Sequence, residues 1–189
     1  IGRSLLPLKD EIEIAPLMRA VREVVAGTPP TMAAEQIEAA RQAMVMRAQT
    51  RAADAANANR EAGIRFLAEN RGTAGVFATA SGIQYRVERA GQGPRPRASD
   101  RVRVHYRGTL LDGTEFDSSY ARNEPASFPL NRVIKGWTEG VALMRVGETF
   151  EFVIPSDLAY GSRWVGGDEL PPNSTLRFTV ELLEVNPAG

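Results

Sequence analysis

The alternation of apolar and polar positions predicts a β-sheet in the second half of the chain. Within residues 101–107, two valines and Tyr106 fall on one face, whereas the arginines and His105 fall on the other. Successive side chains of a strand point to opposite faces, so this pattern is typical of a strand with one face on a core and one in water. We therefore expect an antiparallel sheet around this segment.

The rest of the sheet is predicted from turns and from shorter apolar runs. Asp112-Gly113, between two apolar flanks, indicates a tight hairpin turn. A short helix near residues 136–144 is expected to cross one face of the sheet. The expected strands are residues 81–87, 101–106, 110–117, 149–154 and 175–185. The predicted fold class is α+β, an antiparallel sheet wrapped around a short helix, after an all-α segment and a long helix.

The first 27 residues are predicted to form short helices. Apolar side chains recur from Ile14 to Val25 at spacings of three and four, and Gly27 suits the end of a helix. Fewer than 30 residues cannot bury a sufficient core alone. The apolar stripe therefore packs within a small helical pair or, as we expect, against the same segment of a second copy.

A long helix is predicted over residues 31–71, which contain no proline and are rich in alanine. Thr31 is the expected N-cap and Gly72 the expected end, with Gly63 as a weak point. Such a helix would be about 60 Å long. Its lateral stripe is mostly methyl groups, so we expect it to stand largely in solvent as a spacer.

These patterns divide the chain into three parts. Residues 1–30 are expected to be a helical association segment, residues 31–72 a connecting helix, and residues 73–189 a sheet domain.

Composition narrows the classes of function. The 189 residues have no formal net charge, no cysteine and one histidine. A neutral chain has no general attraction to nucleic acid, and one histidine without cysteine argues against a zinc site or a catalytic triad. No stretch approaches the roughly 20 apolar residues that span a bilayer. The chain begins at Ile1 rather than methionine, so we expect an upstream segment to have been removed.

Five short motifs stand in the predicted sheet domain. In chain order they are His105-Tyr106-x-Gly108, Asp112-Gly113-x-x-Phe116-Asp117-Ser118-Ser119, Val133-Ile134-x-Gly136-Trp137, Leu158-Ala159-Tyr160-Gly161 and Pro171-Pro172-Asn173-Ser174-Thr175-Leu176. Together they resemble the FKBP-type peptidyl-prolyl cis-trans isomerases over residues 82–185. The helical region before them resembles the bacterial macrophage-infectivity-potentiator (Mip) branch of that family.

Prolyl isomerisation, the activity that this resemblance implies, needs no nucleophile, metal or cofactor. The barrier is about 18–20 kcal/mol because rotation removes amide resonance. A catalyst need only bind the twisted amide more tightly than the planar states. The twisted amide has less charge separation, so a dry apolar cavity with a few fixed hydrogen bonds favours it. Aromatic side chains around the proline ring, with one or two polar groups, are what this chemistry requires.

The resemblance implies roles for particular residues. Asp117 would face the reacting amide, held by Arg122 and Tyr106. The Ile134 backbone N–H and the Tyr160 hydroxyl would bind substrate carbonyls. The other residues implied to bind substrate are Trp137, beneath the proline ring, and Phe116, Phe128, Val133, Leu170 and Phe178.

Each residue also has a purely structural interpretation. Val133, Ile134 and Phe178 would be core residues in any small sheet protein. Asp117 could merely cap the turn that follows it, and Trp137 could be ordinary core. The functional interpretation therefore depends on the ordered set of motifs.

Some positions depart from the family pattern or stand outside it. Ala126 stands where many relatives have an aromatic residue, and Arg132 stands where eukaryotic relatives often have an acid. The loop of residues 162–170 contains Trp164 and two acids, so substrate preference and macrolide affinity stay open. His105 is expected to point away from the core and to take no part, because the reaction transfers no proton.

We expect an isomerase that assists protein folding, acts on proline-containing polypeptides and binds macrolide inhibitors of the FKBP class. The resemblance implies a homodimer through the N-terminal helices, in which two weak sites gain from effective concentration. It also implies the periplasm, outer membrane or surface of a Gram-negative bacterium, or secretion from it. One rival is a holding chaperone whose isomerase activity is incidental, and another is a structural, adhesin-like protein.

Overall fold

The computed structural model describes residues 14–27, 34–163, 165 and 170–187. By its contacts the chain forms two compact units, Ile1–Asp54 and Ala55–Gly189. The division falls inside a long helix, so the last part of that helix belongs to the second unit. The three-part division predicted from the sequence stays a prediction.

Helix α1, Ile14–Val25, confirms the helical periodicity of the first segment. It ends as expected at Gly27, whose φ of +81° suits a residue without a Cβ atom. Its apolar side chains are exposed within the described residues, with Val24 59% and Val25 83% accessible. The expected helices in residues 1–13 lie outside the described residues.

Helix α2, Ala34–Asn70, has 37 residues and runs without a break through Gly63. At 1.5 Å per residue it is about 55 Å long. Its first half is largely exposed, as expected from its alanine-rich stripe, and Ile37 and Met46 are accessible to solvent. The expected N-cap, Thr31, lies outside the described residues.

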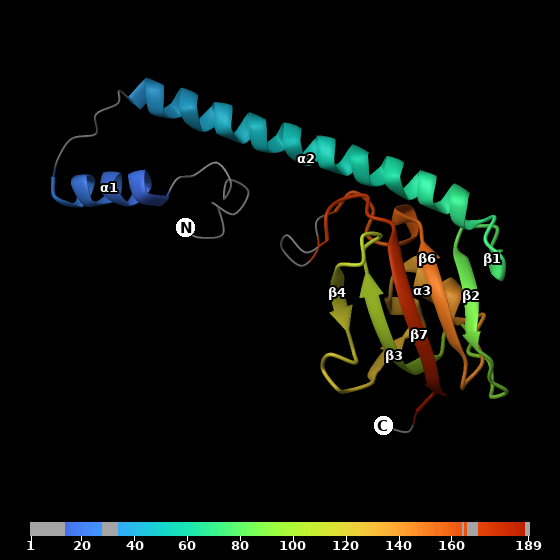
Figure 1. The fold of residues 1–189 in the computed structure, drawn as a ribbon. Helices are drawn as coiled ribbons and strands as arrows, with labels where there is room; N and C mark the ends of the chain where they lie inside the picture. The colour runs from blue at the N-terminus through green and yellow to red at the C-terminus, as the bar shows by residue number, and fades with distance from the viewer. Residues whose placement is uncertain (1–13, 28–33, 164, 166–169, 188–189) are drawn as a thin grey trace. The chain divides into compact units, whose positions relative to one another are not determined.

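The second unit is built on one antiparallel sheet of seven strands. The strand order is β1-β2-β6-β7-β3-β4 (Figure 1). Strand β5 pairs with the first half of β3, and β4 pairs with its second half. The strands are β1 Val76–Ala78, β2 Gln84–Arg89, β3 Arg101–Thr109, β4 Glu115–Ser118, β5 Ala126–Pro129, β6 Thr149–Ile154 and β7 Leu176–Val185. The predicted α+β class is confirmed.

The strand boundaries differ from the sequence prediction in several places. The strand expected over residues 81–87 is β2, Gln84–Arg89, and β3 continues to Thr109, three residues beyond its expected end. The strand expected over residues 110–117 is only β4, because the Asp112-Gly113 turn occupies the residues before it: Gly113 N–H donates to Leu110 O at 3.1 Å. Strands β1 and β5 were not predicted. Each has three or four residues, too few for an alternating pattern to be recognised.

Helix α3, Lys135–Val141, lies very close to the sheet because two of its residues are glycines. A Cβ atom on Gly136 would lie 2.4 Å from Ile154 Cγ2, and one on Gly140 would lie 2.9 Å from Phe152 Cε1. This close approach brings Trp137, between the two glycines, into the core.

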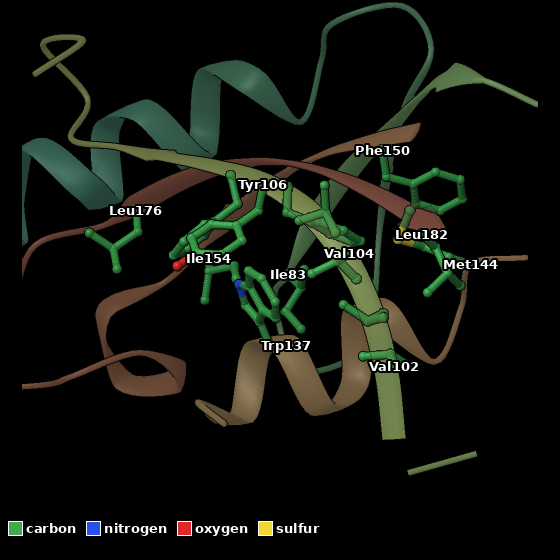
Figure 2. Close-up of a cluster of buried hydrophobic side chains, with 14 of the residues drawn as sticks. Ile83, Val102, Val104, Tyr106, Trp137, Met144, Phe150, Ile154, Leu176 and Leu182 are labelled. Carbon is green, nitrogen blue, oxygen red and sulfur yellow. The ribbon is translucent and has the colours of Figure 1, made fainter. Parts of the chain in front are cut away.

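The core lies between α3 and the inner face of the sheet. Val102, Val104 and Tyr106 all point into it, which confirms the predicted alternation of β3. Figure 2 shows Trp137 rising from α3 towards Tyr106, with Ile83 and Ile154 beside them.

The last part of α2 packs against the sheet unit. Buried Gln84 of β2 accepts a hydrogen bond from Asn70 Nδ2 at 2.7 Å and donates one to Leu67 O at 2.6 Å. Gly63 is also buried, and a Cβ atom there would lie 2.2 Å from Thr175 Oγ1. The glycine that weakens the helix therefore allows it to approach the sheet domain.

Replacing Gly63 by alanine tests this contact. Helix propensity alone predicts stabilisation by about 1 kcal/mol. The overlap with Thr175 instead predicts a free energy of unfolding lower by about 1–3 kcal/mol, as for other overpacked sites. Denaturant unfolding measures the difference, and Thr175→Ala in the same chain should relieve much of it. A more stable Gly63→Ala variant would show that the helix does not pack there.

Candidate active site

A cavity of about 680 Å³ opens between β3, β4, α3 and the segment after β6. Its wall combines aromatic rings with a few charged groups. The residues that line it are Tyr106, Phe116, Asp117, Phe128, Arg132, Val133, Ile134, Lys135, Trp137, Asp157, Ala159, Tyr160, Gly161, Arg163 and Phe178.

Trp137 forms the centre of an aromatic cluster. Tyr106, Phe128 and Phe178 lie 5.2, 5.8 and 5.4 Å from it, centroid to centroid, and each ring is within 8° of perpendicular. Phe116 meets Phe178 in the same way, at 5.6 Å and 90°. Edge-to-face contacts of this kind favour a fixed geometry over a sliding one. The cavity therefore has a rigid apolar lining.

The aromatic lining explains the glycine of the first motif. A Cβ atom on Gly108 of β3 would lie 2.7 Å from Phe116 Cζ and 2.8 Å from Phe178 Cε1. Any larger residue would push these two rings from their places. Gly108 is thus required by the cavity and not by backbone conformation.

Three polar groups form a closed triangle at one side of the cavity. Tyr106 hydroxyl donates to Asp117 Oδ2 at 2.5 Å, and Arg122 Nη1 donates to Asp117 Oδ1 at 2.5 Å. Arg122 Nη2 donates to the Tyr106 hydroxyl at 2.9 Å. The carboxylate is thereby paired and hydrogen-bonded, which allows it to lie beside an apolar cavity.

These contacts shift the protonation of the triangle. Partial burial acts to raise the pKa of Asp117, but the hydrogen bonds from Tyr106 and Arg122 outweigh it and hold the pKa below its usual value. Burial, followed by the bond to Asp117, raises the pKa of Tyr106. Burial also raises the pKa of Tyr160, as does the charge of Asp117. Near neutral pH Asp117 is therefore ionised, and the phenols of Tyr106 and Tyr160 are neutral.

Ser119 fixes the backbone beneath the triangle. Its buried Oγ accepts a hydrogen bond from Tyr106 N–H at 2.7 Å, and its own N–H donates to Tyr106 O at 2.9 Å. His105 lies on the other side, with Nδ1 2.9 Å from Ser119 Oγ and its ring stacked on Tyr120. As expected, His105 points away from the cavity.

The structure brings together most of the residues expected at the site. Two of them do not line the cavity: Arg122 acts on it through Asp117 and Tyr106, and Leu170 is a core residue with 5% of its surface exposed. Ala126 lies in β5 away from the lining. In the loop of residues 162–170, Trp164 and residues 166–169 lie outside the described residues.

Sequence reasoning missed several cavity residues. Ala159 and Gly161 stand in a motif beside Tyr160, but Lys135, Asp157 and Arg163 gave no signal because single surface charges have no pattern. Arg132, noted as a departure from the family, does line the cavity. The rim is thus more highly charged than was expected.

The described residues contain neither a metal-binding cluster nor a helix that could span a membrane. Nowhere in that part of the chain do three His, Asp or Glu side chains gather as a metal site would require. None of its helices is both long enough and apolar enough to cross a membrane.

Comparison with known proteins covers both halves of the chain. Residues 93–183 match the family of FKBP-type peptidyl-prolyl cis-trans isomerases, and residues 1–87 match the domain amino-terminal to such isomerases. A Legionella longbeachae protein named outer membrane protein MIP is 46% identical over 134 residues, which is 71% of this chain and 57% of its own length. The chain also spans only 47% of an FkpA isomerase of Aeromonas hydrophila, at 55% identity.

Other relatives are matched over most of their length. The crystal structure of FkpA from Escherichia coli superposes with a TM-score of 0.76 at 40% identity, covering all of this chain and 88% of that one. A Neisseria meningitidis protein named as a probable FkpA isomerase is 42% identical over 192 residues, or 98% of this chain and 70% of its own length. The chain therefore belongs, as its motifs indicated, to the FKBP-type peptidyl-prolyl cis-trans isomerases that have the amino-terminal domain.

Proposed function

We propose that the protein catalyses cis-trans isomerisation of Xaa-Pro bonds in unfolded or partly folded polypeptides. One observation above all supports this proposal: the rigid aromatic cavity around Trp137, with the paired carboxylate of Asp117 at its edge. The cavity offers an apolar place for a proline ring. Rotation about the Xaa-Pro bond needs neither a nucleophile nor a proton carrier.

The lining would act by preferring the twisted amide. A proline ring on Trp137 would be framed by Tyr106, Phe116 and Phe178, which exclude water from the bond that rotates. The twisted amide is less polar than either planar state, so transfer to this surface lowers the barrier. The Tyr160 hydroxyl and the Ile134 N–H would hold the carbonyls on either side.

Asp117 would face the reacting amide in this arrangement. Arg122 and Tyr106 hold its two oxygens, so its charge is fixed in direction before substrate arrives. Phe128 and Val133 would close the edge of the ring pocket. Leu170 would support the wall from the core rather than touch the substrate.

We further propose that the protein is a homodimer through its N-terminal helices. The support is the exposed apolar face of α1, where Met18, Val21, Val24 and Val25 have no cover within the described residues. Such a stripe is stable in water only against another apolar surface. The same face could instead hold unfolded chains, which is the alternative function as a chaperone.

The cell envelope of a Gram-negative bacterium is the proposed location. The similarity to a protein named as an outer membrane protein supports it. Macrolide inhibitors of the FKBP class are proposed ligands of the aromatic cavity, where Arg132 would meet them at the rim.

Removing the carboxylate tests the proposed site. Asp117→Leu should lower kcat/KM for a short Xaa-Pro peptide by at least about tenfold, because a fixed charge at the reacting bond is lost. Tyr106→Phe should have a smaller effect in the same direction. The matched control is Glu115→Leu, which removes a neighbouring surface carboxylate paired with Arg107. If Asp117→Leu retains full turnover, Asp117 has no part in the site.

The pH dependence follows from the protonation of the site. The lowered pKa of Asp117 keeps it ionised, and the raised pKa values of Tyr106 and Tyr160 keep them neutral. Turnover should therefore be constant from about pH 5 to pH 9. The stability due to Asp117 is present above its unfolded pKa and is lost as pH falls through the lower folded pKa. A bell-shaped profile near neutrality would contradict this account.

Deletion of residues 1–27 separates association from catalysis. We expect light scattering to give the mass of a dimer for the intact chain and of a monomer for the deletion variant. Peptide isomerisation should remain, because the cavity lies within the second unit. A monomeric intact chain would disprove the dimer. Loss of protection against aggregation, without a change of mass, would favour the chaperone role for α1.

A further inference from the structure

Residues 55–70 of α2 make hydrogen bonds with the segment that precedes β7. Asn59 Nδ2 donates to Pro172 O at 3.0 Å. In return, Asn173 Nδ2 donates to Ala56 O of the helix at 3.2 Å. All four residues belong to the unit Ala55–Gly189, so this is a contact within one compact body. Two asparagines thus connect the helix to the segment in both directions.

Asn173 is also hydrogen-bonded to a residue that lines the cavity, Gly161. Its backbone N–H donates to Gly161 O at 2.7 Å, and Gly161 directly follows Tyr160. Gly161 N–H in turn donates to Ser156 O at 2.9 Å. A chain of three hydrogen bonds therefore runs from the Ala56 carbonyl through Asn173 to the segment that holds Tyr160.

The backbone of Asn173 is suited to this double role. Its φ of +58° is in the left-handed region, where asparagine and glycine are tolerated best. This conformation lets the side chain bond the helix while the N–H bonds the tyrosine segment. Nearby, Ser174 Oγ donates to Pro171 O at 2.8 Å and closes the turn.

The position of the Tyr160 side chain depends on contacts of this kind. It lies on a non-repetitive segment after the short helix Ser156–Leu158, where neither a strand nor a long helix fixes its position. Side chains on loops are placed less accurately than those on regular elements unless neighbouring groups hold them. Two other lining residues differ in this respect, because Tyr106 is on β3 and Trp137 is on α3.

We propose that Asn173, supported by Asn59, is a positioning residue for the isomerase and acts on the reaction through Tyr160. The part of α2 that contains Ala56 and Asn59 then contributes to the working site and is not only the end of a spacer. The inference rests on the proposed function, since it assigns Asn173 to the same cavity. Its consequence is that cutting the chain after α2 would leave the cavity intact in outline but Tyr160 less well placed.

The test compares variants that remove hydrogen bonds at the two ends of residues 55–70 of α2, the part of the helix that packs against the sheet. Asn173→Gly keeps the left-handed backbone and removes the amide that reaches Ala56, so the variant should fold. We expect it to lower kcat/KM about tenfold, as small displacements of substrate-contacting groups do. Asn59→Ala, in a helix that tolerates alanine, should give a smaller loss. Both are measured with a short Xaa-Pro peptide on the full chain.

Asn70→Ala is the matched control. It removes the hydrogen bond between the helix and buried Gln84. This bond is at the other end of residues 55–70 from the contacts with Asn173. We expect it to lower the thermal midpoint of unfolding while kcat/KM stays within about twofold of the wild type. An equal loss of turnover in Asn70→Ala would mean that helix docking in general matters and that Asn173 has no special part.

A double variant provides the readout that a structural role would not change. In a Tyr160→Phe background, Asn173→Gly should lower kcat/KM no further, because the two changes remove the same interaction. Additive losses would overturn the inference, as would full turnover of Asn173→Gly alone. If the wild-type chain itself shows no turnover, both the proposed function and this inference fail. If the wild-type chain is active and Asn173→Gly is equally active, only this inference fails.

Discussion

The perpendicular packing of Trp137 against three other rings is the constraint on which the rest of the second unit depends. It requires α3 to lie almost in contact with the sheet, which is why Gly136 and Gly140 flank the indole. Among the described residues, Trp137 Nε1 is the only buried side-chain polar atom without a hydrogen-bond partner. An unpaired buried donor costs about 1–3 kcal/mol. Its presence at the floor of the cavity is typical of a site in which function, and not stability alone, has set the packing.

The same constraint determines the chemistry that the cavity can perform. Rings held edge to face leave an apolar space of fixed shape. Among the described residues that line this space, Asp117 is the carboxylate that forms an ion pair, with Arg122. In the proposed mechanism such a site needs no nucleophile, because it acts by binding the twisted amide more tightly than the planar one. A millionfold acceleration needs about 8 kcal/mol of differential binding. Exclusion of water from the amide, together with two or three fixed hydrogen bonds, would supply part of this differential binding free energy.

The sequence predicted the family, the α+β class, the buried face of β3 and most of the residues around the cavity. These features depend on local periodicity or on motifs in which spacing carries the information. It could not predict why Gly63, Gly108 and Gly136 are glycines. In each case the side chain that leaves no room for a Cβ atom comes from another part of the chain. Nor could it predict the bonds from Asn59 and Asn173, since single asparagines in a helix and a loop have no pattern. Charges at the cavity rim were missed for the same reason.

The most direct test of the central claim is the cis-to-trans isomerisation of a short peptide with an apolar residue before proline, measured with and without a macrolide inhibitor of the FKBP class. The account predicts turnover by the full chain and its loss when the macrolide occupies the cavity around Trp137. A folded sample without turnover would contradict it, and so would turnover that the macrolide leaves unchanged while bound.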